Sequence, residues 1–464
     1  MNQSEIHDKL ITLVGRENVL AKKQELYNYS IDYSTKEQYY PLFVVKPANT
    51  EQVSMIVKFC NEINLNLTVR GGGSSVSGGA LSNSKDVIIS LERLNKIIEI
   101  DEINRHVIAE AGVITQILQD ELKSIGYWFP QNISSSNICF IGGNVAISSG
   151  SPKSLKYGST KNYVLNLQVV LADGQIIWTG KNVRKNATGY NLTQLFVGSE
   201  GTLGIITKVV LEITPLKEEI LVLIPFKEEE LLFQFVFDLF HHKFDPSSLE
   251  FLDRNGYKMV CNYFEEEINF LEEISALLWI EFESERQEEN LNKLERLDNL
   301  IQDYSTSNFF VAQTNREMEK LWRYRKNIGN AAINHSYFKD LDLVVPKSKI
   351  EIMYMYIKSV CQSLNQEFIV VGHIGDGNFH VNIFKDRELV KNQWEEKLKE
   401  CITTLVGKAI ELGGDISGEH GIGKHNKTLF SDFVDKENLK IFQKMKKLFD
   451  PKNLFNSGTI FIDK

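Results

Sequence analysis

A glycine-rich stretch in the first quarter of the chain limits the possible folds more than any other feature. Residues Arg70 to Ala80 read RGGGSSVSGGA, with five glycines among eleven residues. Each glycine in an ordered segment costs roughly 0.5–1 kcal/mol relative to alanine. The stretch follows a predicted strand at Phe43–Lys46, a helix that starts after Asn49 and a strand at Leu65–Val69. Loops at strand ends bind ligands more often than they act as linkers, so we predict a loop whose backbone N–H groups close on a phosphate.

Two common phosphate-binding loops do not fit this stretch. A dinucleotide-binding fingerprint needs a glycine where this chain has Val76 and a helix afterwards, whereas Val87–Leu94 reads as another strand. A nucleoside-triphosphate loop needs a lysine after its second spaced glycine, whereas Gly78 is followed by Gly79 and Ala80. The pattern therefore favours a cofactor whose phosphates are bound and left unreacted.

The composition is that of a globular protein of 464 residues, long enough for two or three domains. The net charge of −9 argues against a nucleic-acid partner. The start MNQSEIHDKLITLV is too acidic for a signal peptide, and no run approaches the roughly 18 apolar residues of a membrane-spanning helix, so we expect a cytoplasmic protein. The five cysteines are far apart and indicate no disulfide framework, zinc ribbon or iron–sulfur cluster.

Two histidines in VVGHIGDGNFHVNIF, residues 370–384, are candidate metal ligands. Asp376-Gly377 is a strong signal for a two-residue hairpin turn. A turn centred there pairs His373 with His380, and opposed residues on paired strands share a face with Cβ atoms about 4.5–5.5 Å apart. Asn382 points the same way as His380. A lone strand histidine is more often structural, but two opposed imidazoles can hold one metal ion.

A third candidate ligand, Glu419, stands beside His420 in GGDISGEHGIGKHNK, residues 413–427. On spacing alone, a helix C-cap followed by a polar turn explains this segment about equally well. Two histidines and one carboxylate with an open coordination position are typical of a catalytic rather than a structural metal site.

These motifs, together with glycine-rich segments at 140–158 and 185–215, resemble the FAD-linked family of vanillyl-alcohol oxidase and p-cresol methylhydroxylase. More narrowly, the chain is similar to the branch of D-lactate dehydrogenase, the GlcD-like glycolate oxidase flavoprotein subunit and D-2-hydroxyglutarate dehydrogenase. The resemblance implies an α+β protein. Its expected domains are an FAD-binding domain of the p-cresol methylhydroxylase type with an N-terminal helical lead-in at 1–216, an α+β substrate domain with an antiparallel sheet at 217–440, and a C-terminal segment returning to the FAD domain at 441–464.

The resemblance also implies FAD, held without a covalent bond because no histidine stands where some relatives attach their flavin. The loop at 71–77 matches the segment that surrounds the FAD pyrophosphate with backbone N–H groups. The positions implied to bind FAD are Arg70, Gly71, Gly72, Gly73, Ser74, Ser75, Ser77, Gly78, Gly142, Gly143, Asn144, Gly150, Tyr157, Gly158, Glu200, Gly201, Gly204 and Ile206.

For the reaction, the resemblance implies a divalent metal, Zn, Mn or Fe, bound by His373, His380 and Glu419. It assigns His420 as the base, because an imidazole with its ordinary pKa near 6.5 can take a hydroxyl proton at neutral pH. A metal-assisted hydride transfer to flavin N5 would follow, with Asn382 as a further catalytic residue. Arg325, aligned through Trp322, matches the arginine that binds the substrate carboxylate.

The sequence thus predicts an FAD-dependent D-2-hydroxyacid dehydrogenase that converts a D-lactate-like acid, or glycolate, to the 2-oxo acid. Lys339 is one residue out of register with a second cationic position, which favours a monocarboxylate over D-2-hydroxyglutarate. Without a second redox centre, electrons would pass to an electron-transfer flavoprotein, a cytochrome or a quinone, with at most peripheral contact with the inner membrane. The alternatives are a D-2-hydroxyglutarate dehydrogenase, a non-redox enzyme of the alkyl-dihydroxyacetone-phosphate synthase type and a silent subunit. Whether the chain forms a homodimer stays open.

Overall fold

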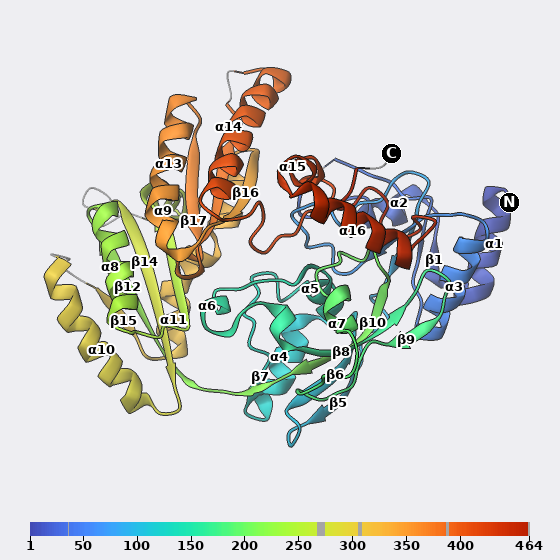
Figure 1. Ribbon diagram of the computed structural model, residues 1–464, viewed down its shortest axis with the longest axis horizontal. Coiled ribbons are helices and arrows are strands. Elements are labelled where there is room, and N and C mark those ends of the chain that lie inside the picture. Colours follow the sequence, from blue (N-terminus) through green and yellow to red (C-terminus); the bar gives the residue numbers. More distant parts are fainter. Residues whose placement is uncertain (36, 267–273, 305–308, 387–388, 463–464) are drawn as a thin grey trace. The chain divides into compact units, whose positions relative to one another are not determined.

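The computed structural model describes residues 1–35, 37–266, 274–304, 309–386 and 389–462. They form two compact units, and many of their elements are labelled in Figure 1. Unit 1 comprises Met1–Gly150, Ser159–Leu216 and Glu419–Lys464, and unit 2 comprises Ser151–Gly158 and Lys217–Gly418. The last change of unit lies at Gly418 and not near residue 440, because the chain soon after Gly418 already binds unit 1: the N–H groups of Lys424 and His425 donate to the Ser77 carbonyl oxygen at 3.0 and 3.1 Å.

The first sheet of unit 1 contains the predicted strand–helix–strand arrangement. Asn49 caps the connecting helix by accepting a hydrogen bond from the Gln52 N–H at 2.9 Å, and this helix buries Val53, Ile56 and Cys60. The sheet order is β1 (Val19–Leu20), β2 (Phe43–Val45), β4 (Val87–Ser90) and β3 (Leu67–Arg70), with β2 and β3 both parallel to β4, and the helix is α3 (Thr50–Glu62). The glycine loop therefore begins where β3 ends.

The second sheet of unit 1 is antiparallel. Its order is β5 (Ile97–Asp101), β6 (His106–Glu110), β10 (Ile205–Glu212), β8 (Val164–Val170) and β9 (Ile176–Trp178), and a separate short pair is formed by β7 (Tyr127–Trp128) and β11 (Thr214–Pro215). The helices of this unit, besides α3, are α1 (Gln3–Val14), α2 (Lys23–Leu26), α4 (Thr115–Ser124), α5 (Ile141–Ile147), α7 (Leu192–Phe196), α15 (Lys427–Phe433) and α16 (Lys436–Phe449).

Unit 2 is built on a seven-stranded sheet in which every pair of neighbouring strands is antiparallel. Its order is β15 (Phe310–Ala312), β12 (Glu218–Phe226), β14 (Ala276–Ser284), β13 (Ser248–Asp253), β17 (Phe368–Gly372), β18 (Asn378–Phe384) and β16 (Phe338–Val344). The α+β class and the antiparallel sheet of the second domain are therefore confirmed.

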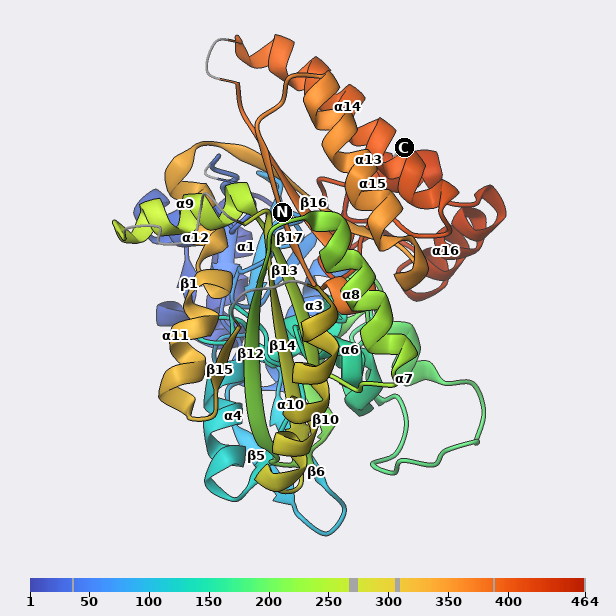
Figure 2. The ribbon, with the colours of Figure 1, turned by 90° about the vertical axis from the view of Figure 1, so that its left-hand side faces the viewer.

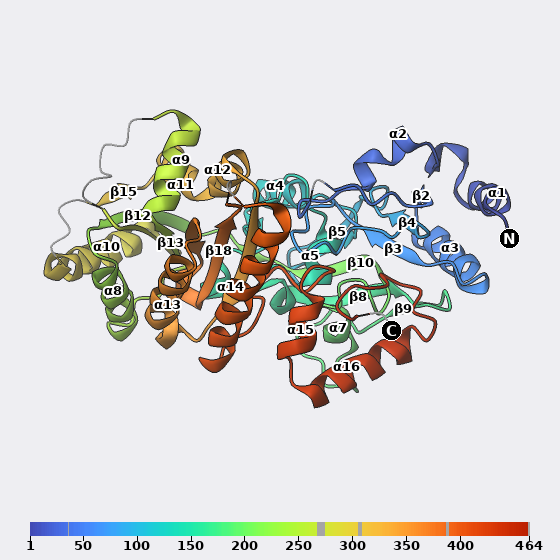
Figure 3. The same ribbon diagram turned by 90° about the horizontal axis from the view of Figure 1, so that it is seen from above.

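Helices cover both faces of this sheet, as Figure 3 shows. On one face, α9 (Arg254–Phe264), α11 (Asn315–Lys326) and α12 (Ile328–His335) form a common apolar core with Leu252, Trp279 and Val371. On the other face, Phe233 and Tyr354 contact the ring of Phe251. They belong to α8 (Glu229–His241) and α13 (Ile350–Ser363), which lie on that side with α10 (Gln287–Ile301) and α14 (Lys391–Glu411); Figure 2 looks toward α8 and α10. The short α6 (Ser154–Tyr157) completes unit 2.

The predicted two-residue turn at Asp376-Gly377 is wrong. Val371, and not His373, pairs with His380, and a 3-10 turn at Ile374–Asp376 joins the two strands. The turn packs inward, because a Cβ at Gly375 would come within 2.8 Å of the Leu249 Cβ. The register differs from the prediction by two residues, which is one full strand period, so His373 and His380 still belong to the same face.

Candidate active site

The glycine loop Arg70–Ala80 lies against the segment that leads into α5. A Cβ at Gly72 would come within 2.1 Å of the Ile138 carbonyl oxygen, so this position requires glycine. The ideal Cβ of Gly71 lies 3.9 Å from the Cα of Gly143, while a Cβ at Gly143 would meet no described atom outside its own helix turn within 4 Å. The loop therefore contacts the start of α5, and the position beside Gly143 is open.

The loop also offers backbone donors. Within the described ranges, the N–H groups of Gly72, Gly73 and Ser74 donate no hydrogen bond to another part of the protein. Uncommitted backbone N–H groups next to glycines that allow close approach are what a diphosphate needs. The residues present therefore fit the pyrophosphate of FAD.

The side chain of Arg70, one of the implied FAD positions, forms hydrogen bonds with the protein backbone. Its buried guanidinium donates to the carbonyl oxygens of Ala80 at 3.2 Å, Asn28 at 3.1 Å and Ile31 at 2.8 Å. It therefore ties both ends of the glycine loop to the N-terminal segment.

Several other implied FAD positions lie in close-packed parts of unit 1. The Asn144 side chain donates to the Thr115 hydroxyl at 2.7 Å, and Ser75 and Ser77 hydroxyls lie 3.2 Å apart. Cβ atoms at Gly142 and Gly204 would come within 2.5 Å of Ala111 and 2.6 Å of Val169, respectively. Ile206 is buried, and Gly73, Gly78 and Gly201 have the positive φ angles that glycine tolerates best.

Tyr157 and Gly158 belong to unit 2, unlike the other implied FAD positions. The Tyr157 hydroxyl donates to Glu283 at 2.5 Å. The structure thus uses Tyr157 to hold the Ser151–Gly158 segment on the seven-stranded sheet.

Glu200 is a buried carboxylate that holds the loop after His420. Its oxygens accept hydrogen bonds from the N–H groups of Ile422 at 2.8 Å and Gly423 at 2.7 Å. Burial raises the pKa of Glu200 to about 7, although both backbone hydrogen bonds act to lower it. Glu419 lies in the same unit against Gly150, where a Cβ would come within 2.5 Å of its Oε2.

The two candidate histidine ligands lie on one face of unit 2. The His373 and His380 rings are 5.5 Å apart between centroids and nearly perpendicular. His373 Nδ1 is 2.6 Å from Glu250 Oε1, and His380 Nδ1 is 3.9 Å from Asp342 Oδ1. The Glu250 carboxylate at Nδ1 of His373 leaves Nε2 as the natural ligand atom of that ring, and two adjacent imidazoles are a donor set that fits a divalent metal.

Gly418, the last residue of unit 2, is held at the edge of this sheet by β16. Asp342 Oδ2 accepts from the Ser417 hydroxyl at 2.7 Å, and its carbonyl accepts from the Gly418 N–H at 3.0 Å. Nε2 of His420 lies 3.7 Å from Oε1 of Glu419.

Arg325 is bound by a carboxylate that the sequence analysis missed. Its Nε and Nη2 atoms lie 2.8 and 2.7 Å from Glu250 Oε2. Glu250 is completely buried on β13, between Leu249 and Phe251. The available signal was an acid flanked by the apolar residues Leu249 and Phe251 within the strand SLEFLD.

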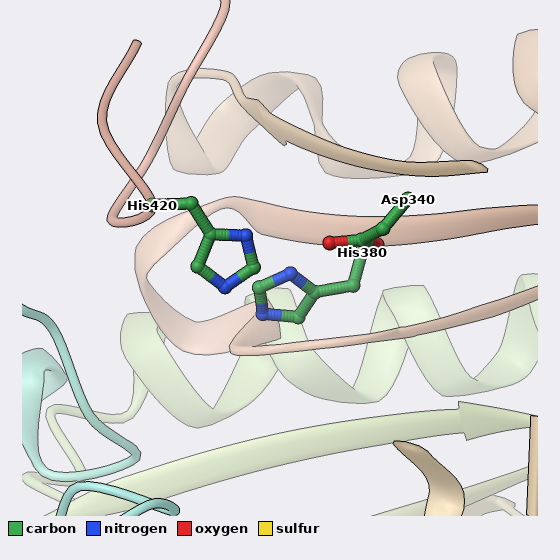
Figure 4. A group of neighbouring side chains, drawn as sticks. All are labelled: Asp340, His380 and His420. Carbon is green, nitrogen blue, oxygen red and sulfur yellow. The ribbon is translucent and has the colours of Figure 1, made fainter. Parts of the chain in front are cut away.

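Asn382 and Asp340 pair across the edge of the same sheet. Asn382 donates to Asp340 Oδ1 at 2.6 Å. Because Asp340 pairs with Asn382 in the ladder, it shares a face with His380, and ligand atoms of Asp340 and His380 lie within 4.8 Å of each other (Figure 4). Lys339 lies on the opposite face of β16.

Comparison with known proteins identifies the class of protein. Residues 41–180 match the family described as "FAD binding domain", and residues 216–460 match "FAD linked oxidases, C-terminal domain". The chain therefore belongs to the FAD-linked oxidase family, an oxidoreductase family that carries FAD, and the resemblance stated above is confirmed.

Curated relatives extend over nearly the whole chain. The chain is 33% identical to glycolate oxidase subunit GlcD of Bacillus subtilis, over 99% of this chain and 97% of the relative. It is 34% identical to a D-lactate dehydrogenase of Archaeoglobus fulgidus, over 90% of each chain. It is 27% identical to a D-2-hydroxyglutarate dehydrogenase of Stutzerimonas stutzeri, over 99% of this chain and all of the relative.

Solved structures confirm the fold of the p-cresol methylhydroxylase type. Substrate-bound p-cresol methylhydroxylase matches with a TM-score of 0.79 at 17% identity, over 99% of this chain and 97% of that one. An alkyldihydroxyacetonephosphate synthase matches with a TM-score of 0.75 at 16% identity, over 98% and 85%. Among the described residues, no helix combines the length and apolar character needed to cross a membrane.

Proposed function

We propose that this protein oxidises a D-2-hydroxy acid to the 2-oxo acid, with non-covalently bound FAD and a divalent metal ion held by His373, His380 and Glu419. The observation that carries the proposal is the pair of perpendicular histidines on the sheet of unit 2, one of which shares the buried carboxylate of Glu250 with Arg325. The names of the full-length relatives, which are hydroxyacid dehydrogenases and a glycolate oxidase subunit, support the same substrate class.

Each side chain has a task that suits its chemistry. Bound FAD supplies a two-electron acceptor, and a bound Zn, Mn or Fe ion supplies a Lewis acid that lowers the pKa of the substrate hydroxyl. Arg325 orients the substrate C1 carboxylate, because its guanidinium keeps N–H donors beyond the two directed at Glu250. His420 accepts the hydroxyl proton, and Asn382 donates a hydrogen bond that helps to position the substrate.

Within this substrate class we infer a small monocarboxylate such as D-lactate or glycolate. Asp340 places a carboxylate on the face of His380 and Asn382, where it would repel a second substrate carboxylate. The Cβ of Lys339 lies on the opposite face of β16, from where its ammonium still attracts the Asp340 carboxylate. The alternative is D-2-hydroxyglutarate, which a relative of equal length oxidises according to its name.

An anaerobic substrate panel tests the proposal. We expect D-lactate or glycolate to bleach the flavin absorbance of the purified protein, with D-2-hydroxyglutarate slower and L-lactate inactive. Alanine at His373, His380 or Glu419 should remove the metal, measured by elemental analysis, and leave FAD in place. A wild-type protein that is active without any divalent metal would refute the metal part, and failure of all these acids would refute the substrate class.

The electrons must then leave the reduced flavin. We propose an electron-transfer flavoprotein, a cytochrome or a quinone as acceptor. Turnover with an artificial dye should greatly exceed hydrogen peroxide production in air. Peroxide formation at the dye-supported rate would instead identify an oxidase.

A further inference from the structure

We propose that Glu250 is a positioning residue that serves two parts of the site at once: it orients His373 as a metal ligand and Arg325 as the binder of the substrate carboxylate. The inference deepens the proposed function and rests on it. Nothing in the sequence patterns or in the comparisons assigns a role to Glu250.

The two carboxylate oxygens of Glu250 are divided between these partners. Oε1 lies 2.6 Å from His373 Nδ1, and Oε2 lies 2.7–2.8 Å from two nitrogens of Arg325. Glu250 is completely buried, and the Arg325 side chain is only 11% exposed. Both contacts are therefore shielded from water, where charge-assisted hydrogen bonds are strongest.

The sheet register explains why one residue reaches both partners. β13 pairs with β17 so that Phe251 faces Gly372, and continuing this register places Glu250 opposite His373. Arg325 approaches from the last turn of α11, which packs on the same face of the sheet. The contact is thus set by the tertiary fold.

The contact with Glu250 determines which ring nitrogen of His373 carries the proton. A carboxylate only accepts hydrogen bonds, so Nδ1 of His373 must carry the proton and Nε2 keeps the lone pair that a metal requires. On the other side, Arg325 can only donate. Glu250 therefore needs two acceptor oxygens, and glutamine at this position offers one.

The substitution E250Q tests this requirement directly. The amide of the glutamine has only one acceptor oxygen, so its NH₂ group must face either Arg325 or His373 Nδ1. Facing Arg325, it sets two donors against each other. Facing His373, it forces the ring proton to move from Nδ1 to Nε2. Because Arg325 is always charged, we expect the amide oxygen to face Arg325, so that His373 loses its acceptor. The affinity of the metal-stripped, FAD-containing protein for Zn²⁺ should then fall tenfold or more. The measurement is competition with a chelator, repeated with Mn²⁺.

A second substitution should restore the metal. Without the guanidinium, the introduced amide is free to turn its oxygen toward His373. We therefore expect E250Q/R325M to bind Zn²⁺ within about threefold of R325M alone, although both variants lose binding of D-lactate. If Glu250 only stabilised the fold, the double variant would bind metal no better than E250Q, and that result would overturn the proposal.

Glu229 supplies a matched control, because it also accepts from two donors, Tyr354 and Lys358, but from the other face of the sheet. E229Q should leave the Zn²⁺ affinity unchanged. If E250Q does not purify with FAD, the comparison of R325M with E250Q/R325M tests the inference by itself. A double variant that binds Zn²⁺ tenfold more weakly than R325M contradicts the inference.

The outcome is separable from the proposed function. Wild-type protein that holds no metal would refute the metal site itself. Wild-type protein with metal, together with an unchanged Zn²⁺ affinity in E250Q, would refute only the role of Glu250.

Discussion

The carboxylate of Glu200 accepts a hydrogen bond from the Gly423 N–H at 2.7 Å, so a buried acid of unit 1 fixes the loop that starts directly after Glu419 and His420. Glu200 belongs to the segment at residues 185–215 that resembles the FAD-binding domain. Its side chain therefore links a predicted cofactor segment to a predicted catalytic segment within one unit.

Glu200 should make stability depend on pH. Burial raises its pKa to about 7, above the ordinary value of 4.5. Its stabilising contribution is therefore complete below about pH 4.5 and is lost as the pH rises through about 7, by on the order of 3 kcal/mol. We expect the melting temperature of wild type to fall relative to that of E200Q between pH 5 and pH 8. A constant difference across this range would contradict the assigned burial effect.

The open space beside Gly143 should be occupied by FAD. Substitution G143V adds side-chain atoms where no described atom lies within 4 Å of the Cβ position, so the fold should persist while FAD is excluded. G329V is the control, since Gly329 also lies in a helix with open surroundings. We expect colourless G143V and yellow G329V with similar far-UV circular dichroism; a yellow G143V would place the flavin elsewhere.

The flavin itself should be released by acid. Without a covalent bond, precipitation of the wild-type protein in acid leaves FAD in the supernatant, where chromatography distinguishes it from FMN. Flavin that stays in the pellet would show a covalent link.

A buried cluster in unit 2 gives a further prediction about stability. Lys153 forms ion pairs with Glu219 at 2.7 Å and with Glu281 and Glu283. K153M leaves the buried Glu281 and Glu283 and the partly exposed Glu219 without their shared cation, so we expect a loss of about 3–5 kcal/mol at pH 8. The loss should shrink at pH 5, because burial already raises the pKa of Glu281 to about 7 and the acids can take up protons.

Denaturant unfolding measures this effect. Exposed Lys181 provides the control, as K181M should change the free energy of unfolding by no more than about 0.5 kcal/mol. Equal losses for K153M at both pH values would argue against a charge effect.

The sequence predicts those parts of the fold that are set by local signals. Asn49 and the apolar spacing of α3 gave the strand–helix–strand arrangement, because capping and periodicity act within a few residues. The prediction of a two-residue turn at Asp376-Gly377 was wrong, because packing of Gly375 against Leu249 outweighs the local preference for such a turn.

The part of the site that the sequence did not reveal depends on contacts between residues far apart in the chain. Glu250 meets His373 across 123 residues and Arg325 across 75. No pattern around Glu250 encodes those partners; the register of β13 against β17 and the position of α11 create them. The candidate ligands were recognisable because motifs carry them, whereas the residues that orient these ligands were not.

Substrate choice should depend on Asp340. Its carboxylate shares a face with His380 and Asn382, and two like charges about 6 Å apart repel by about 3 kcal/mol at an effective dielectric constant near 20, less in salt. D340N should therefore raise kcat/KM for D-2-hydroxyglutarate relative to D-lactate by about tenfold, which corresponds to about 1.4 kcal/mol. K339Q should not raise this ratio, because it removes a cation that attracts Asp340 and leaves the carboxylate on the face of His380 and Asn382 in place. A wild-type preference for D-2-hydroxyglutarate that collapses in K339Q would instead make Lys339 the second carboxylate binder, and the enzyme a D-2-hydroxyglutarate dehydrogenase.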